Sequence, residues 1–395
     1  MGRSRILSVL MCALGVFLIF AVAAFGLMLA KNVNAANDAR PLLVSTPIAT
    51  IVPIAPKREP DIRPLEQIAP RVALPVSPTR VAVVRVESKQ WVTWGETRVR
   101  ADVVDVRLSL FPRPLNDNGR GIHWFPTLSQ KREVIDRFVP ELVAMRMQWV
   151  VVLQGLDEWN LTANDYLIDR LNDAGIVPVM RIDAQVGALN LERLRLVVQH
   201  YRARGVRYYQ IYNEPNFRAE WADKSDVNAS QFIAQWLPAA QVVAENGGLP
   251  GLAPLAPTGD LDDVLFLENT LTTLVRARRF DIINVMWLAI HNYGGLDDKG
   301  FYRYRRYDAM ARYVLGQHLP MLATEGGMGD AHTSADTIVA AFEHMRSREP
   351  WLLAYCPWLI GNAVGGGHDE TWETQAWFQR NGALPIVERV KGMLP

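Results

Sequence analysis

The feature that most constrains the fold is a regular alternation of short apolar runs and amphipathic stretches between residues 121 and 395. Most of the intervening stretches have helical periodicity, among them Leu189–Ala203, Ala229–Glu245 and Ser334–Arg348. Short buried strands that alternate with helices form parallel βαβ units, and eight units in about 275 residues fit a (β/α)8 TIM barrel. The eight predicted strands are Gly121–Pro126, Met147–Leu153, Val177–Ile182, Arg207–Tyr212, Gly248–Ala256, Ile282–Ile290, Met321–Thr324 and Ala354–Ile360.

A doubly wound sheet is the alternative arrangement of such units. It usually carries a glycine-rich phosphate-binding turn early in the chain, and this sequence shows none there. The fifth predicted strand is the least regular, because Pro250 and Pro254 interrupt it. Upstream, residues 81–120 contain β-branched runs with Trp91 and Trp94, which indicates a hairpin or an extended lead-in.

The N-terminus has the composition of a membrane segment. Ile6–Ala30 is a run of 25 residues without a charge, preceded by Arg3 and Arg5. At ~1.5 Å per residue such a helix spans a hydrocarbon core of ~30 Å, and a basic flank favours the cytoplasmic side. Residues 1–30 are therefore predicted to anchor the chain, with the remainder outside the cytoplasm. The competing interpretation is a signal peptide cleaved near Ala35, which would yield a secreted protein.

Residues 31–80 are predicted to form a proline-rich linker. Nine prolines lie between residues 41 and 80, a density that suits neither a helix nor a central strand. Such a segment acts as a semi-rigid spacer of up to ~3.1 Å per residue. The predicted organisation is thus an anchor (1–30), a linker (31–80), lead-in strands (81–120) and one barrel (121–395).

Charge and cysteine content exclude several functional classes. The 42 Lys and Arg residues balance 41 Asp and Glu residues, whereas a nucleic-acid binder shows a basic excess. Two cysteines cannot provide a disulfide framework or a cysteine-based zinc site. From the balanced charge we expect no nucleic-acid partner. Neither charge nor cysteine content predicts the oligomeric state.

Two predicted strands end in a glutamate. The fourth ends in Tyr212-Asn213-Glu214-Pro215, and the seventh leads into Glu325. Because catalytic groups of barrels lie at the carboxyl ends of the strands, these two carboxylates are expected on one rim. Such a pair suits glycosidic bond cleavage, in which one carboxyl group donates a proton and the other attacks or stabilises the sugar cation. The alternative is that each glutamate only caps the following helix.

This pattern resembles clan A of the glycoside hydrolases, in particular the cellulase-like family 5 and family 39. The resemblance covers about residues 121–395 and rests on Asn213-Glu214-Pro215 after the fourth strand, together with Glu325 after the seventh. It implies that Glu214 is the general acid/base and Glu325 the nucleophile of a retaining double displacement. It also implies that Asn213 binds the sugar 2-hydroxyl.

The resemblance extends to other strand ends. His291 and Tyr293 match the His-x-Tyr pattern of family 5, which implies that the Tyr293 hydroxyl holds the nucleophile while His291 lines an adjacent subsite. A hydroxyl donor favours the ionised form of a carboxylate. Trp358, in the eighth strand, would form the floor of the sugar site, and His123 at the first strand is a further substrate-binding candidate. A buried rim histidine without a role is the alternative for His291.

Arg181 and Asp183 end the third strand and either contact substrate or form an internal ion pair. The second strand ends in Leu153-Gln154-Gly155-Leu156, so the arginine that many family 5 enzymes carry near this point is not evident. Further aromatic residues follow several strands and suggest an extended oligosaccharide cleft, although each suits a core position equally well: Trp159, Phe217, Trp221 and Trp372.

The sequence therefore predicts a retaining glycoside hydrolase that acts on an extracellular oligo- or polysaccharide, or a transglycosylase with the same intermediate. A non-catalytic cell-surface glycan-binding barrel is the second hypothesis, because an anchor and a spacer also suit display. A metal-dependent hydrolase needs a cluster such as His-x-His at the first strand, where this chain offers His123 alone. We therefore expect no metal and no cofactor. The sugar and its linkage do not follow, because loops determine specificity.

Overall fold

The computed structural model describes residues 91–94, 97–224, 226–327, 330–362 and 370–394. The chain divides into two compact units between Arg85 and Val86, and every described residue belongs to the second. The predicted membrane segment Ile6–Ala30 and the linker 31–80 lie outside the described residues. Among the helices that the structure describes, none is both long and apolar enough to cross a bilayer.

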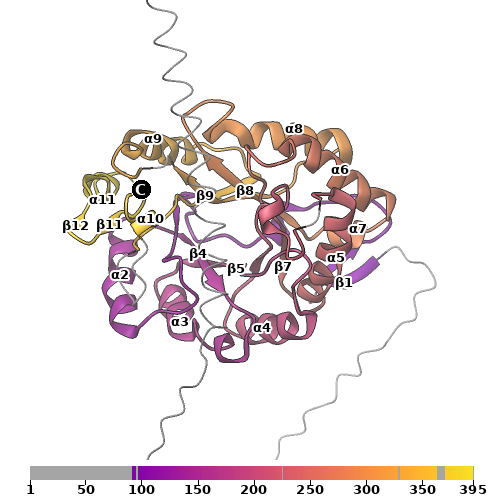
Figure 1. Ribbon diagram of the computed structural model, residues 1–395, viewed down its shortest axis with the longest axis horizontal. Coiled ribbons are helices and arrows are strands. Elements are labelled where there is room, and N and C mark those ends of the chain that lie inside the picture. Colours follow the sequence, from indigo (N-terminus) through magenta and orange to yellow (C-terminus); the bar gives the residue numbers. More distant parts are fainter. Residues whose placement is uncertain (1–90, 95–96, 225, 328–329, 363–369, 395) are drawn as a thin grey trace, which may run out of the picture. The chain divides into compact units, whose positions relative to one another are not determined.

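Eight parallel strands form one sheet in which each strand pairs with the next along the chain. The first and last strands approach each other through a parallel bridge between Arg120 and Tyr355 and a hydrogen bond from the amide of His123 to Pro357 O (3.0 Å). The sheet is therefore a nearly closed barrel, which fits the predicted (β/α)8 fold (Figure 1). The strands are β3 (Gly121–His123), β4 (Trp149–Gln154), β5 (Val177–Ile182), β6 (Tyr208–Ile211), β7 (Leu249–Leu252), β8 (Trp287–Tyr293), β9 (Met321–Gly327) and β10 (Leu352–Tyr355).

A helix follows each barrel strand, and these helices surround the strands (Figure 1). Local side chains start several of them: Asn190 Oδ1 accepts the amide of Arg193 (3.0 Å), and Asp262 Oδ1 accepts that of Leu265 (2.9 Å). The helices that follow the strands are α2 (Arg132–Ala144), α3 (Asp165–Asp173), α4 (Leu191–Ala203), α5 (Ala229–Glu245), α6 (Asp263–Arg276), α8 (Tyr304–Leu315), α9 (Ala335–Met345) and α11 (Pro385–Lys391). Shorter elements are η1 (Leu108–Leu110), η2 (Glu158–Asn160), η3 (Arg218–Glu220), η4 (Phe301–Arg303), α7 (Phe280–Ile283), α10 (Glu370–Glu373), β11 (Phe378–Gln379) and β12 (Gly382–Ala383).

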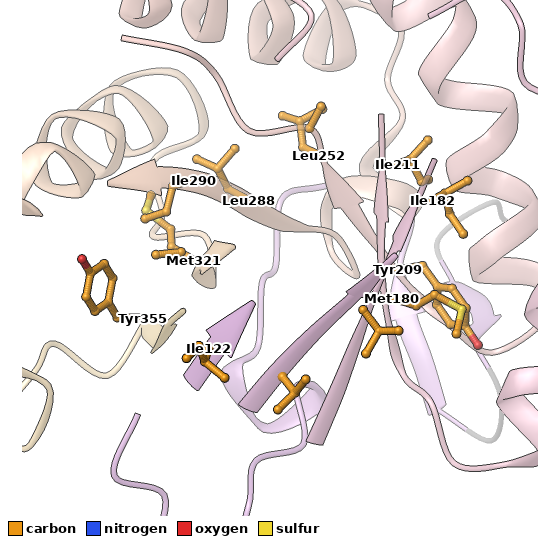
Figure 2. Packing of buried hydrophobic residues seen from close by; sticks show 14 of the residues in the cluster. Ile122, Met180, Ile182, Tyr209, Ile211, Leu252, Leu288, Ile290, Met321 and Tyr355 are labelled. Atoms are coloured by element: carbon orange, nitrogen blue, oxygen red, sulfur yellow. The ribbon is translucent and has the colours of Figure 1, made fainter. Parts of the chain in front are cut away.

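The alternation of side chains along each strand creates two cores. In β4, Val150 and Val152 belong to an outer cluster that includes helix residues such as Phe138, and Figure 2 shows members of this cluster on several strands. Trp149 and Val151 of the same strand belong to an inner cluster with the alternate residues of neighbouring strands. Both faces of the sheet are therefore apolar, as is usual for parallel strands.

Seven of the eight predicted strands have different bounds in the structure, and the fifth, sixth and eighth differ most. The eighth, predicted at Ala354–Ile360, ends at Tyr355, so Trp358 follows this strand and does not lie within it. The segment predicted at Ile282–Ile290 begins as the helix α7, and the strand starts only at Trp287. Its amides explain the change, because those of Ile282 and Ile283 both donate to Arg279 O in a helical turn. The fifth strand exists but is short, and it ends before Pro254, which has no N–H to extend the ladder.

A hairpin precedes the barrel, in the region for which the sequence left a hairpin or an extended lead-in open. β1 (Trp91–Trp94) pairs antiparallel with β2 (Thr97–Arg100). The indole N–H of Trp94 donates to Gly248 O (3.0 Å), and Trp94, Val99 and Phe111 belong to the inner cluster.

Further contacts fix the chain between the hairpin and β3. The hydroxyl of Tyr208 donates to Pro112 O (2.7 Å), and the indole N–H of Trp149 donates to Asp117 Oδ1 (2.9 Å). Tyr208 and Trp149 are the first residues of their strands, so this segment covers the N-terminal end of the barrel.

Candidate active site

Polar side chains of several strands meet at the opposite, C-terminal end of the barrel. Parallel strands present their carboxyl ends at one rim, which is where residues far apart in the sequence can combine into one site. The side chains that contact one another there are Arg181 of β5, Glu214 after β6, His291 and Tyr293 of β8, and Glu325 of β9, and Asn213 next to Glu214 contacts Glu220.

An irregularity in β9 determines the direction of Glu325. Ile290 pairs with Ala323, but the next pair is His291 with Glu325, so β9 contains one extra residue, Thr324. Ala323 faces the outer cluster, and strict alternation would send Glu325 to the same side. A bulge of one residue reverses this parity, and Glu325 faces the barrel interior beside His291.

Both oxygens of Glu325 have a partner. The guanidinium of Arg181 forms an ion pair with Oε1, and the Tyr293 hydroxyl donates to Oε2 at 2.6 Å. The side chains of Glu325 and Arg181 are only 11% and 14% exposed. Burial alone would raise the pKa of Glu325, but His291, Arg181 and the Tyr293 hydroxyl outweigh it and hold that pKa well below its usual range. Glu325 is therefore a carboxylate at neutral pH.

Glu214 lies in a turn with unusual backbone angles. Its φ is 30° and that of Tyr212 is 67°, values that residues other than glycine rarely adopt and that cost free energy. Its carboxyl oxygen Oε1 lies 2.7 Å from His291 Nδ1. The same nitrogen lies 3.7 Å from Glu325 Oε2, so these two oxygens are at most about 6.4 Å apart. One imidazole thus lies between the two predicted catalytic carboxyl groups.

A third carboxyl group, that of Glu220, contacts the side chain of Asn213. Asn213 Nδ2 donates to Glu220 Oε1 (3.0 Å), and among the described residues Asn213 Oδ1 is buried without a partner. Burial, together with the charge of Glu214, raises the pKa of Glu220 to about 7. Asn213 is therefore at the rim, but its amide nitrogen is bound to a neighbour, and its contact with a sugar hydroxyl stays a prediction.

His123 and Trp358 lie at the same rim. Their rings are 4.2 Å apart, and Trp358 belongs to a small apolar cluster against which Tyr293 packs. His123 Nδ1 donates to Trp124 O (2.9 Å), and burial lowers the pKa of His123 to about 3. Its ring is thus neutral, and Nε2 is an acceptor for which the described part of the chain offers no donor.

The other aromatic candidates separate into buried and exposed residues. Trp221 is 4% exposed, and its indole N–H donates to Pro215 O (2.8 Å), so it supports the loop after β6, and it also lines a pocket beside Val186 and Gln231. Trp159, in η2 after β4, is 67% exposed. Phe217 and Trp372 are half-buried.

No group of three or more His, Cys, Asp or Glu side chains in the described part of the chain is arranged to hold a metal ion. Cys356, the cysteine that the structure describes, is buried in the inner cluster, and burial raises the pKa of its thiol.

Two side chains of the candidate site were not assigned a role from the sequence. Arg181, expected to contact substrate or to form an internal ion pair, pairs with Glu325 of β9. The third barrel strand thus supplies an arginine to this carboxylate, where the second strand carries none. Glu220 was not predicted at all, because nothing in the sequence marks a glutamate seven residues after Asn213.

No protein-family model matches the chain, and no curated protein matches it. Similar solved structures include glycoside hydrolases of families 39 and 5 and a β-glucuronidase, all of clan A. A family 39 glycoside hydrolase from Bacteroides cellulosilyticus is 12% identical with a TM-score of 0.49, and the match covers 73% of this chain and 64% of that enzyme.

An endo-β-1,4-glucanase from Xanthomonas axonopodis pv. citri is 10% identical with a TM-score of 0.47, over 69% of this chain and 96% of the glucanase. A β-glucosidase from Thermotoga maritima is 12% identical with a TM-score of 0.39, over 57% of this chain and 76% of that enzyme. The reaction therefore has to be inferred from the side chains of the site.

Proposed function

We propose that this protein is a retaining glycoside hydrolase in which Glu325 is the nucleophile and Glu214 the general acid/base. The observation that carries the proposal is the pair of carboxyl groups at the ends of β6 and β9, with His291 Nδ1 at 2.7 Å from one and 3.7 Å from the other. Two carboxyl groups on one rim are the minimal machinery for this reaction.

The environments of the two carboxyl groups support different roles. Arg181 and Tyr293 keep Glu325 ionised and fixed in direction, as a nucleophile requires. Glu214 has no arginine or lysine partner among the described residues, and its side chain is 19% exposed against 11% for Glu325. It is thus the carboxyl group more accessible to a substrate, which suits the acid/base.

In the first step, Glu325 attacks the anomeric carbon as Glu214 gives its proton to the leaving oxygen, so the C–O bond breaks and a glycosyl ester forms. In the second step, Glu214 removes a proton from water, the water oxygen bonds to the anomeric carbon, and Glu325 is released. A retaining enzyme needs carboxyl groups ~5–5.5 Å apart, whereas an inverting one needs ~6.5–9.5 Å. The upper limit of about 6.4 Å between Glu214 Oε1 and Glu325 Oε2 is compatible with the retaining distance.

The test is turnover of a panel of activated aryl glycosides by the wild type and by Glu325→Ala, with Glu158→Ala as control. Glu158 is a rim glutamate that is 86% exposed, and its loss should leave the rate unchanged. Glu325→Ala should be inactive, and azide should restore turnover by replacing the missing nucleophile. Activity of Glu325→Ala without azide would refute the assignment. Glycan binding by a wild type that releases no sugar would favour a binding protein.

We further propose an oligo- or polysaccharide substrate outside the cytoplasm, with residues 1–30 as the membrane anchor. The uncharged run Ile6–Ala30 after Arg3 and Arg5 supports this location. Expression with and without residues 1–30, followed by membrane fractionation, tests it. Recovery of the full-length chain in the soluble fraction at its intact mass would contradict an anchor.

A further inference from the structure

The loop after β6 holds a glutamate that the two-carboxylate reaction does not use. Glu220 ends η3, and its Oε1 accepts the amide hydrogen of Asn213 Nδ2 at 3.0 Å. Asn213 immediately precedes the proposed acid/base. Glu220 is therefore one side chain away from Glu214, without taking part in bond cleavage itself.

The segment that Glu220 contacts is strained. Tyr212 and Glu214, on either side of Asn213, both have positive φ, at 67° and 30°. Residues other than glycine keep such angles only where surrounding contacts enforce them. Two contacts join this turn to the rest of the loop: the amide of Phe217 donates to Glu214 O (2.8 Å), and the side chain of Asn213 donates to Glu220.

Glu220 itself is held in place by its backbone. The amide of Val186, in the loop after β5, donates to Glu220 O (2.8 Å), and the amide of Ala222 donates back to Val186 O (3.0 Å). The next residue, Trp221, is buried and donates to Pro215 O. The carboxyl group of Glu220 is thus presented to Asn213 from a point fixed by two neighbouring loops.

We propose that Glu220 is a positioning residue, which holds the Asn213–Glu214 turn and thereby the direction of the Glu214 carboxyl group toward the substrate. The proposal rests on the proposed function of Glu214 as acid/base. Glu220 acts through Asn213, because that amide is its side-chain contact among the described residues.

The ionisation of Glu220 predicts that its effect on Asn213 depends on pH. Burial and the charges of Glu214 and Glu325 raise the pKa of Glu220, whereas Asn213 and Arg181 lower it, with a result of about 7. An ionised acceptor makes a hydrogen bond about twice as strong as a neutral one. The hydrogen bond from Asn213 to Glu220 is therefore strongest above pH 7 and weakens as the pH falls through 7.

The experiment is a double-mutant cycle of Glu220→Ala and Asn213→Ala, with kcat, KM and thermal unfolding measured for each variant. Small displacements of a catalytic group cost up to about a hundredfold in rate. We expect Glu220→Ala to lower kcat about ten- to hundredfold while KM changes less than about twofold. The double variant should be no slower than Asn213→Ala within about twofold, because both changes break the same contact. Additive losses would overturn the proposal.

Glu220→Gln provides the second measurement and stays informative if Glu220→Ala does not fold. Glutamine keeps the shape and an acceptor oxygen but never ionises, so kcat should fall less than in Glu220→Ala, and the pH profile should lose an ionisation near pH 7. An unchanged profile would contradict the proposal. Glu158→Gln, on the exposed turn η2, is the matched control and should leave kcat, KM and the profile unchanged.

Failure of the two proposals can be told apart. A wild type that is inactive on every glycoside contradicts the function, and coupling of the two substitutions in thermal unfolding would then still report the Asn213–Glu220 contact. An active wild type with additive effects on kcat contradicts the role of Glu220 alone.

Discussion

Replacement of Arg181 by methionine offers the sharpest test of how this site keeps Glu325, the proposed nucleophile, ionised. Methionine approximates the length of the side chain and removes the charge that faces Glu325 Oε1. Tyr293 still donates to Oε2, and His291 still lies 3.7 Å away. The change therefore isolates the contribution of one guanidinium to the pKa of Glu325.

The expected shift in the pKa of Glu325 is large because the ion pair is buried: the side chains of Arg181 and Glu325 are 14% and 11% exposed. An arginine beside a carboxyl group lowers its pKa by about 1–3 units, and one unit corresponds to about 1.4 kcal/mol. Loss of Arg181 should thus raise the pKa of Glu325 by about 1–3 units, a free-energy change of about 1.4–4 kcal/mol.

The assay is kcat/KM on an aryl glycoside between about pH 2 and pH 9, because the pKa of Glu325 is lowered to about 2. Glu325 must be ionised to attack, and the acidic limb of the profile reports its pKa in the free enzyme. We expect this limb to move toward higher pH by about 1–3 units in Arg181→Met. The matched control is Arg193→Met, which removes an exposed ion pair with Glu158 (3.5 Å) and should leave the limb in place. An acidic limb that stays where it was would refute the reasoning.

Stability provides a readout that does not depend on turnover. Because the pKa of Glu325 is lower in the folded chain than in the unfolded one, its ionisation stabilises the wild type above about pH 4.3 and loses this effect as the pH falls through the folded pKa. Removal of one partner of a buried pair costs about 3–5 kcal/mol. The difference in unfolding free energy between the wild type and Arg181→Met should be largest at neutral pH and shrink below about pH 4.

Two further substitutions separate catalysis from stability. Tyr293→Phe removes the 2.6 Å hydrogen bond to Glu325 Oε2. Because a hydrogen bond to a charged group contributes about 1.5–3 kcal/mol, kcat/KM should fall about ten- to hundredfold. A change below twofold in pH–rate measurements would contradict this role of Tyr293. Asp263→Asn breaks the buried ion pair with Arg303 (2.6 Å) between α6 and η4. The free energy of unfolding in urea should fall by about 3–5 kcal/mol, while kcat/KM of the folded protein stays the same. An unchanged midpoint of urea unfolding would contradict this prediction.

Most of the barrel could be predicted from the sequence because its strands are buried on both faces. Such strands are near-continuous apolar runs, and each of the eight predicted runs overlaps one barrel strand. The bounds were harder to predict. Ile282 and Ile283 are apolar and β-branched, and only the hydrogen bonds to Arg279 O assign them to α7 instead of to the following strand.

In the site, positions that depend on the local sequence could be predicted, whereas contacts between distant segments could not. The location of Glu214 and Glu325 on one rim could be predicted, because positions near the carboxyl ends of strands are local features of the sequence. The direction of Glu325 depends on the extra residue Thr324 in the pairing with β8, and strict alternation would have sent its side chain to the outer cluster. The contacts of Arg181 with Glu325 and of Glu220 with Asn213 join separate segments, so no spacing rule reveals them.

The hairpin and the segment after it have a practical consequence for where the folding unit starts. A fragment that begins at Gly121 contains all eight barrel strands, but it lacks Pro112 O and Asp117 Oδ1, the acceptors of Tyr208 and Trp149. Each buried donor left without a partner costs about 1–3 kcal/mol, and the loss of Trp94 would open the inner core to water. The shortest autonomous fragment should therefore begin near Val86, some thirty-five residues before the first barrel strand.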